Sequence, residues 1–221
     1  MPEDVTLAGV DAESEAICGG VCTAAAATAI VSAVCYAYGS IVLRQVNGKT
    51  EAVPIEAVKE GDQLLVKGAS GLHFTPAIAV DLHPESKSPV LTLSTRSGHQ
   101  VTLTPGHMVP VHSEGKEELL PARDVKVGSH LTIVNDAGAT ELSDVIDVSA
   151  AEAPRGVANI LTGPETLVVN GVVGSVHAET TFKGAAGVVR KAVLFANDIA
   201  GARAARYVYR TGEMIHDCFA M

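Results

Sequence analysis

Between residues 35 and 179, the pattern of hydrophobic and polar positions consists of short apolar runs separated by turn residues. Val90–Thr95 and Gln100–Thr104 are typical of these strand-like runs. Asn47-Gly48 and Asn170-Gly171 are dipeptides that favour tight hairpin turns. Frequent Gly and scattered Pro fit many short strands joined by turns. This pattern predicts an all-β domain with pairing between distant strands.

An internal duplication organises these strands. Residues 53–66 return as residues 120–133, at a constant spacing of 67 residues. The first copy is predicted to hold a short strand at Leu64–Val66 and a hairpin at 90–104, and the second a short strand at Leu131–Val134 and a hairpin at 157–169. Two copies favour a pseudo-twofold pair of β-units over an open solenoid. The matched positions are Pro54, Val58, Lys59, Gly61 and Leu64 with Pro121, Val125, Lys126, Gly128 and Leu131.

The two ends of the chain differ from this middle region. Residues 1–34 form an acidic leader followed by an uncharged, Ala-rich stretch from 16 to 34, which is a helix candidate. That stretch is just long enough to span a bilayer, but small residues insert weakly into one. A membrane segment and a soluble apolar helix therefore both stay open. Residues 180–221 have helical spacing of apolar residues and predict a helical tail that packs on the domain or lies at a membrane surface.

Composition removes several classes of function. A net charge of -9 without a cluster of Lys and Arg argues against nucleic acid as a partner. The cysteines fit neither a common disulfide framework nor a Cys-x-x-Cys zinc site, and we expect no metal and no cofactor. They are Cys18, Cys22, Cys35 and Cys218.

Three residues carry the candidate chemistry. Cys35 opens the first strand-like run, and Thr104 and His107 close a later strand within Thr-Pro-Gly-His. A thiolate is a good nucleophile, and an amide that it attacks needs a general acid to protonate the departing nitrogen. His107 is the natural acid, and Thr104 can hydrogen-bond the scissile peptide and hold it bent. The pattern indicates a site that attacks its own backbone.

These motifs resemble the Hint domain, the self-cleaving module shared by Hedgehog C-terminal domains and inteins. The resemblance covers residues 35–179 and is closer to the Hedgehog side. It is carried by Cys35-Tyr-Ala-Tyr-Gly-Ser-Ile-Val42, Val58-Lys-Glu-Gly-Asp62, Leu103-Thr-Pro-Gly-His107 and Thr166-Leu-Val-Val-Asn-Gly-Val-Val-Gly-Ser-Val-His177.

The resemblance implies a role for each matching residue. Cys35 would be the nucleophile of an N-to-S acyl shift that breaks the Val34-Cys35 peptide and forms a thioester, promoted by Thr104 and His107. Asp81, fourteen residues before Thr95, takes the place of the aspartate that activates a sterol hydroxyl in Hedgehog proteins. His177 would polarise the scissile carbonyl. The protein would thus be a single-turnover, cis-acting autoprotease and acyl transferase.

Three positions depart from the family pattern. Val34 stands where Hedgehog precursors have Gly, and its branched side chain should slow attack. Val176 stands in the stretch where Hedgehog domains often carry a second cysteine. Ala178 follows His177 where inteins have Asn, so Asn cyclisation is excluded there and cleavage is favoured over splicing.

The implied partners are the protein's own N-terminal segment as substrate, a sterol or lipid alcohol (or water) as the resolving nucleophile, and a membrane surface. The resemblance favours the secretory pathway or membrane association. Two alternatives stay open. One is a catalytically silent Hint-like scaffold that serves as an interaction or membrane-tethered module. The other is a processing module whose N-terminal partner domain is missing from this sequence.

Overall fold

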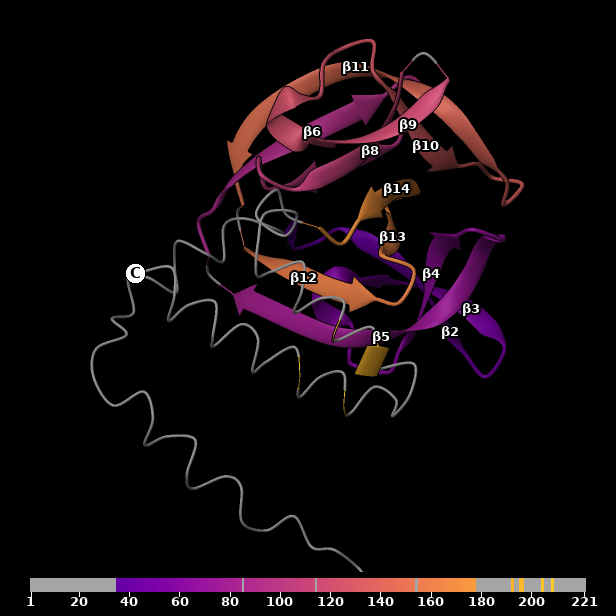
Figure 1. Cartoon of the computed structure of the whole chain (residues 1–221). Helices are drawn as coiled ribbons and strands as arrows, with labels where there is room; N and C mark the ends of the chain where they lie inside the picture. Colours follow the sequence, from indigo (N-terminus) through magenta and orange to yellow (C-terminus); the bar gives the residue numbers. More distant parts are fainter. Residues whose placement is uncertain are drawn as a thin grey trace, which may run out of the picture.

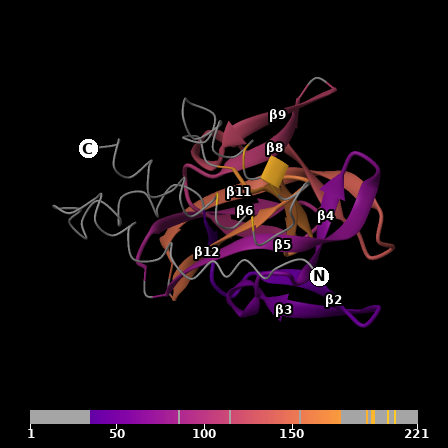
Figure 2. The same cartoon turned by 60° about the horizontal axis from the view of Figure 1, so that its bottom comes forward.

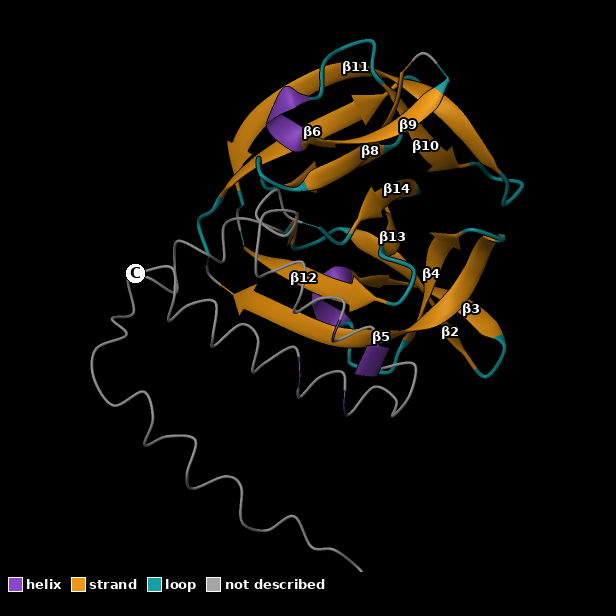
Figure 3. Ribbon diagram, viewed as in Figure 1, coloured by secondary structure: helices purple, strands orange, loops and turns teal. Residues whose placement is uncertain are grey.

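The computed structural model of the chain describes residues 35–84, 86–113, 115–153 and 155–177, together with five single positions of the tail. Strands make up most of this part of the chain, and turns and loops make up nearly all of the rest (Figure 3). The strands are β1 (Tyr36–Ala37), β2 (Ile41–Val46), β3 (Lys49–Pro54), β4 (Gln63–Gly68), β5 (Gly71–Pro84), β6 (Pro89–Thr95), β7 (Gln100–Leu103), β8 (Met108–Ser113), β9 (Lys116–Pro121), β10 (His130–Val134), β11 (Thr140–Glu152), β12 (Gly156–Thr162), β13 (Thr166–Val169) and β14 (Val172–Ser175). Two short 3₁₀ turns, η1 (Ile55–Ala57) and η2 (Ala122–Asp124), complete these elements.

Two long, bent strands connect the halves of the sheet. The first part of β5 pairs with β4, and its second part pairs with β12. In the same way, β11 pairs first with β10 and then with β6. The hydrogen-bonded path runs β11-β6-β7-β1-β12-β5-β4-β2-β13-β14-β10-β8-β9, with β3 on β2. Both views place the β2–β3 and β8–β9 hairpins on opposite sides of the molecule (Figures 1 and 2).

The two copies of the repeat adopt the same local structure, which confirms the predicted duplication. Gly61 and Gly128 both have φ of 89°, a left-handed conformation in which a side chain is strained. The amide of Gly61 donates to the carbonyl of Ala77, and that of Gly128 donates to Val145, each at 2.8 Å. The turns η1 and η2 follow Pro54 and Pro121 at the same spacing.

The short strands predicted at Leu64–Val66 and Leu131–Val134 lie within β4 and β10, and the hairpin predicted at 90–104 is formed by β6 and β7. Both Asn-Gly turns are also confirmed, because they join β2 to β3 and β13 to β14 with positive φ at both turn residues.

The hairpin predicted at 157–169 is wrong. Its two segments are strands, but β12 pairs with β1 and β5, whereas β13 pairs with β14 and β2. Both edges of β12 are already occupied, so the chain turns after Thr162 and β13 joins different neighbours. The run that begins at Cys35 is also interrupted, since Gly39 turns with φ of 85° between β1 and β2.

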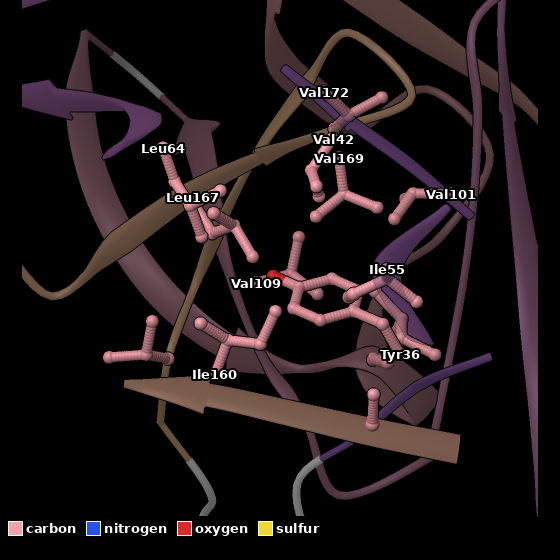
Figure 4. Packing of buried hydrophobic residues seen from close by; sticks show 14 of the residues in the cluster. Tyr36, Val42, Ile55, Leu64, Val101, Val109, Ile160, Leu167, Val169 and Val172 are labelled. Carbon is pink, nitrogen blue, oxygen red and sulfur yellow. The ribbon is translucent and has the colours of Figure 1, made fainter. Parts of the chain in front are cut away.

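The core is aliphatic, in keeping with an aromatic content of only 4%. Tyr36 is the aromatic exception and is 1% exposed. Figure 4 shows its ring among the apolar side chains of the central cluster. Val208 of the tail packs against this cluster. The core therefore surrounds the residue that follows Cys35.

The predicted N-terminal helix, including residues 16–34, lies outside the described residues. In the predicted helical tail, the five described positions are helical: Ala192, Phe195, Ala196, Ala204 and Val208. No helix in the described part of the chain has the length and apolar character needed to cross a bilayer. The division into 1–34, 35–179 and 180–221 stays a prediction.

Candidate active site

Cys35 lies immediately before β1, in the middle of the sheet. Its side chain is 2% exposed and packs with Val90, Ala153 and Val157. The strand that it precedes is held between β7 and β12. The thiol is therefore fixed by neighbours on both sides and largely shielded from bulk water.

Thr104 is joined to Cys35 by two hydrogen bonds. The backbone N–H of Cys35 donates to the hydroxyl oxygen of Thr104 at 3.0 Å, and the N–H of Thr104 donates to the carbonyl oxygen of Cys35 at 2.8 Å. Thr104 is fully buried. The nitrogen of the predicted scissile peptide is thus held by a side chain that lies far away in sequence. Val34 itself lies outside the described residues.

A tight turn brings His107 beneath the same strand. The N–H of His107 donates to the carbonyl of Thr104 at 3.0 Å, and the carbonyl of His107 accepts from Ala122 of η2 at 2.8 Å. The ring centroid of His107 lies 4.3 Å from that of Tyr36 at an interplanar angle of 58°. Backbone hydrogen bonds and aromatic packing together fix the imidazole next to the residue that follows Cys35.

The hydrogen bonds of His107 define its tautomer. Its Nε2 lies 2.8 Å from the carbonyl oxygen of Ser175, which can only accept, so Nε2 carries the proton. Nδ1 is buried and has no hydrogen-bond partner among the described residues. Burial lowers the pKa of His107 to about 4, opposed by the bond to Ser175 and assisted by His177. At neutral pH, His107 is uncharged and its unprotonated nitrogen is Nδ1.

The carbonyl of Ser175 also accepts a hydrogen bond from the hydroxyl of Tyr36 at 2.8 Å. Burial raises the pKa of Tyr36 well above its ordinary value, so the phenol stays protonated. The preceding residue is Gly174, and a methyl group there would collide with the Tyr36 hydroxyl. The end of β14 is therefore shaped to receive both Tyr36 and His107.

His177 lies two residues after the end of β14. Its carbonyl accepts from the N–H of Met108 at 2.9 Å, which places it beside the start of β8. Nε2 of His177 lies 3.2 Å from a carboxylate oxygen of Glu165. Burial lowers the pKa of His177 to about 4. Neutral His177 therefore donates a hydrogen bond from Nε2 to the Glu165 carboxylate. The imidazole becomes positively charged only in acid.

Asp81 lies in β5, two strands away from Cys35. It is opposite Asn159 of β12, and the next residue, Ala158, is opposite Tyr36 of β1. Continuing this register by one residue puts Cys35 opposite Asn159. We call Thr104, Cys35, Asn159 and Asp81 the Cys35 row, because they occupy neighbouring strands at one level of the sheet. Strand spacing puts the Cα atoms of Asp81 and Cys35 roughly 10 Å apart.

The twin of Asp81 in the second copy lies elsewhere. Asp147 is exposed on β11 and pairs with Ser94, well outside the Cys35 row. The duplication thus places an aspartate in both copies, but only Asp81 shares a level with the cysteine.

Sequence reasoning missed four residues around this site: Tyr36, Asn159, Glu165 and Ser175. Tyr36 and Ser175 belong to the motifs quoted above, but their contact spans 139 residues of sequence. Asn159 and Glu165 had no local signal. Among the described residues, no group of three or more His, Cys, Asp or Glu side chains is arranged to hold a metal ion.

The model of the Hint module family matches residues 23–212, which is most of the chain. The chain belongs to the Hint module family. Membership implies self-splicing or autoprocessing as the class of activity. Comparison with curated protein sequences finds no match.

Solved structures with the same fold include several inteins. A DnaB intein from Synechocystis sp. PCC 6803 is 14% identical, with a TM-score of 0.53 over 64% of this chain and 96% of the intein. An intein from a hyperthermophile is 17% identical, with a TM-score of 0.56 over 64% and 98%. A bacterial intein-like domain from Clostridium thermocellum is 18% identical, with a TM-score of 0.52 over 64% and 98%. These likenesses confirm the Hint fold, but they do not confirm the closer resemblance to Hedgehog domains.

Proposed function

We propose that this Hint module cleaves its own chain between Val34 and Cys35 through a thioester. The observation that carries the proposal is the hydrogen bond from the Cys35 amide to Thr104. Beside it, His107 is buried, and its Nδ1 has no partner in the part of the chain that the structure describes. A nucleophile, a group that holds the departing nitrogen and a proton carrier are the parts that an N-to-S acyl shift requires.

The first step moves one proton. Neutral His107 takes the thiol proton of Cys35 at Nδ1, and the thiolate attacks the carbonyl carbon of Val34. The C–S bond forms, the C–N bond to Cys35 breaks, and the imidazolium returns its proton to the nitrogen that leaves. A pKa lowered to about 4 supports the second half of this transfer, because it makes the imidazolium a strong acid that readily gives its proton to the departing nitrogen.

Thr104 assists by holding the peptide nitrogen. Its hydroxyl oxygen accepts from the N–H of Cys35, which concentrates electron density on the nitrogen and favours its pyramidal, protonated form over the planar amide. The contact is buried, and buried hydrogen bonds of this kind are strong and directional. We assign Thr104 to distortion of the scissile peptide.

The second step resolves the thioester with a hydroxyl nucleophile, either water or a lipid alcohol. Asp81 is the base that takes the hydroxyl proton. His177 polarises the scissile carbonyl only when it is protonated, since its neutral form donates to Glu165. Ala178 after His177 offers no Asn for cyclisation, so the outcome is cleavage without splicing.

The experiment is intact-mass analysis of the full chain incubated with and without dithiothreitol, beside Cys35→Ala. We expect release of residues 1–34, accelerated by the thiol and absent in the variant. Full-length mass under every condition would contradict the proposal. That outcome would instead support a silent Hint scaffold, an alternative favoured by the branched side chain of Val34 next to the nucleophile.

A further inference from the structure

Asn159 has a buried polar atom that the fold does not satisfy. Its Oδ1 has no hydrogen-bond partner within the described residues. A buried acceptor without a donor costs about 1–3 kcal/mol, so an unsatisfied one calls for an explanation. Asn159 lies on β12, which is paired on one side with β1 and on the other with β5. β1 begins just after Cys35, and β5 carries Asp81.

The register places the Asn159 side chain between those of Cys35 and Asp81. Residues directly opposite each other in antiparallel strands point to the same face of the sheet, with Cβ atoms about 5 Å apart. Cys35, Asn159 and Asp81 therefore share one face, whereas Tyr36 and Ala158 share the opposite face with the core. A small molecule bound over Asn159 on this face would lie within reach of both the sulfur and the carboxylate.

We propose that the Oδ1 of Asn159 and the carboxylate of Asp81 hold a water molecule, and that this water resolves the thioester. The inference rests on the proposed function and names the nucleophile of its second step. An amide oxygen and a carboxylate oxygen are both hydrogen-bond acceptors. A water molecule has two O–H groups and satisfies both acceptors. An alcohol has one, so when it gives that proton to Asp81 it leaves the Oδ1 of Asn159 without a donor. The pair therefore favours water over a lipid alcohol.

The chemistry of the step balances. The water oxygen bonds to the carbonyl carbon of Val34, and the C–S bond to Cys35 breaks. One water proton passes to Asp81 and then to the leaving thiolate, which regenerates the thiol. The other proton remains on the oxygen, donated to Asn159 during the attack. The products are a free carboxylic acid at Val34 and a free N-terminal Cys35.

The test follows two reactions of the full-length protein. Spontaneous cleavage in ¹⁸O-labelled water reports the second step, and cleavage by dithiothreitol reports thioester formation, because a small thiol attacks without a base. In Asn159→Leu, we expect spontaneous cleavage to fall about tenfold, while thiol cleavage continues. Ser94→Ala, at the twin position opposite Asp147, is the matched control and should behave as the parent.

The outcomes separate the two proposals. If the parent shows no thiol cleavage, the proposed function fails and the inference falls with it. If Asn159→Leu loses both reactions equally, or hydrolyses as fast as the parent, the function stands and the inference is overturned. Vesicles that contain sterol provide a further arm, in which an ester of the released fragment overturns the inference and ¹⁸O-labelled acid supports it.

Discussion

His107 and Tyr36 donate to the same atom, the carbonyl oxygen of Ser175, from rings whose centroids are 4.3 Å apart. This shared acceptor fixes the imidazole proton on Nε2 and leaves Nδ1 for the reaction. Tyr36 packs against the imidazole and shares its acceptor, so it helps to orient the proposed proton carrier. The arrangement also ties the strand that follows the nucleophile to the end of β14.

Replacing His107 by Gln should separate positioning from proton transfer. The Gln amide can donate to Ser175, but it has no nitrogen that titrates. We expect the variant to fold and its thiol-induced cleavage to fall by about a hundredfold or more. Intact mass against time with dithiothreitol measures the rate. Brisk thiol cleavage in the folded variant would remove His107 from the reaction.

The contact between Tyr36 and Gly174 can be measured with a double-mutant cycle. Gly174→Ala places a methyl group against the Tyr36 hydroxyl and should lower the free energy of unfolding by about 1–3 kcal/mol. Tyr36→Phe removes the hydroxyl and should recover part of that loss in the double variant. Urea denaturation gives the free energies of unfolding of the parent, the two single variants and the double variant. Strictly additive effects would show that the two residues do not interact.

Asp81 and Asp147 are equivalent in the repeat, but only Asp81 is at the level of Cys35. Asp81→Asn should slow spontaneous release of residues 1–34 by about a hundredfold, because the base of the second step is lost. Cleavage by dithiothreitol should persist in this variant. Asp147→Asn should leave both rates as in the parent. Equal spontaneous rates in the two variants would argue against a role for Asp81.

Stability should fall in mild acid because two buried histidines resist protonation. The pKa values of His107 and His177 are lowered from 6.5 to about 4. Above pH 6.5, folded and unfolded chains are both neutral at these sites. Between pH 6.5 and 4, the unfolded chain binds protons that the folded chain does not, so stability decreases with falling pH. For His107 alone, the loss reaches about 3 kcal/mol near pH 4.

Urea unfolding at pH 7 and pH 4.5 measures this loss. The difference between the two pH values should be smaller in His107→Gln than in the parent, because the variant lacks one of the two titrating groups. Equal differences in parent and variant would show that His107 does not resist protonation in the folded chain.

Local sequence determined much of this protein. The repeated Pro-led turns with Gly61 and Gly128, and the two Asn-Gly hairpins, depend on the conformations that a few adjacent residues prefer, so they could be predicted directly. Cys35, Thr104 and His107 could be selected as candidates because their chemistry and their motif are written in short stretches of chain.

Tertiary structure decided which strands meet. The hairpin predicted at 157–169 does not form because both edges of β12 are taken by β1 and β5, a competition between partners more than seventy residues apart in sequence. The same long-range pairing puts Asn159 between Cys35 and Asp81 and brings Ser175 to His107 and Tyr36. Tautomer, burial and pKa arise from such contacts, and no local pattern encodes them, because each depends on atoms that only the folded chain brings together.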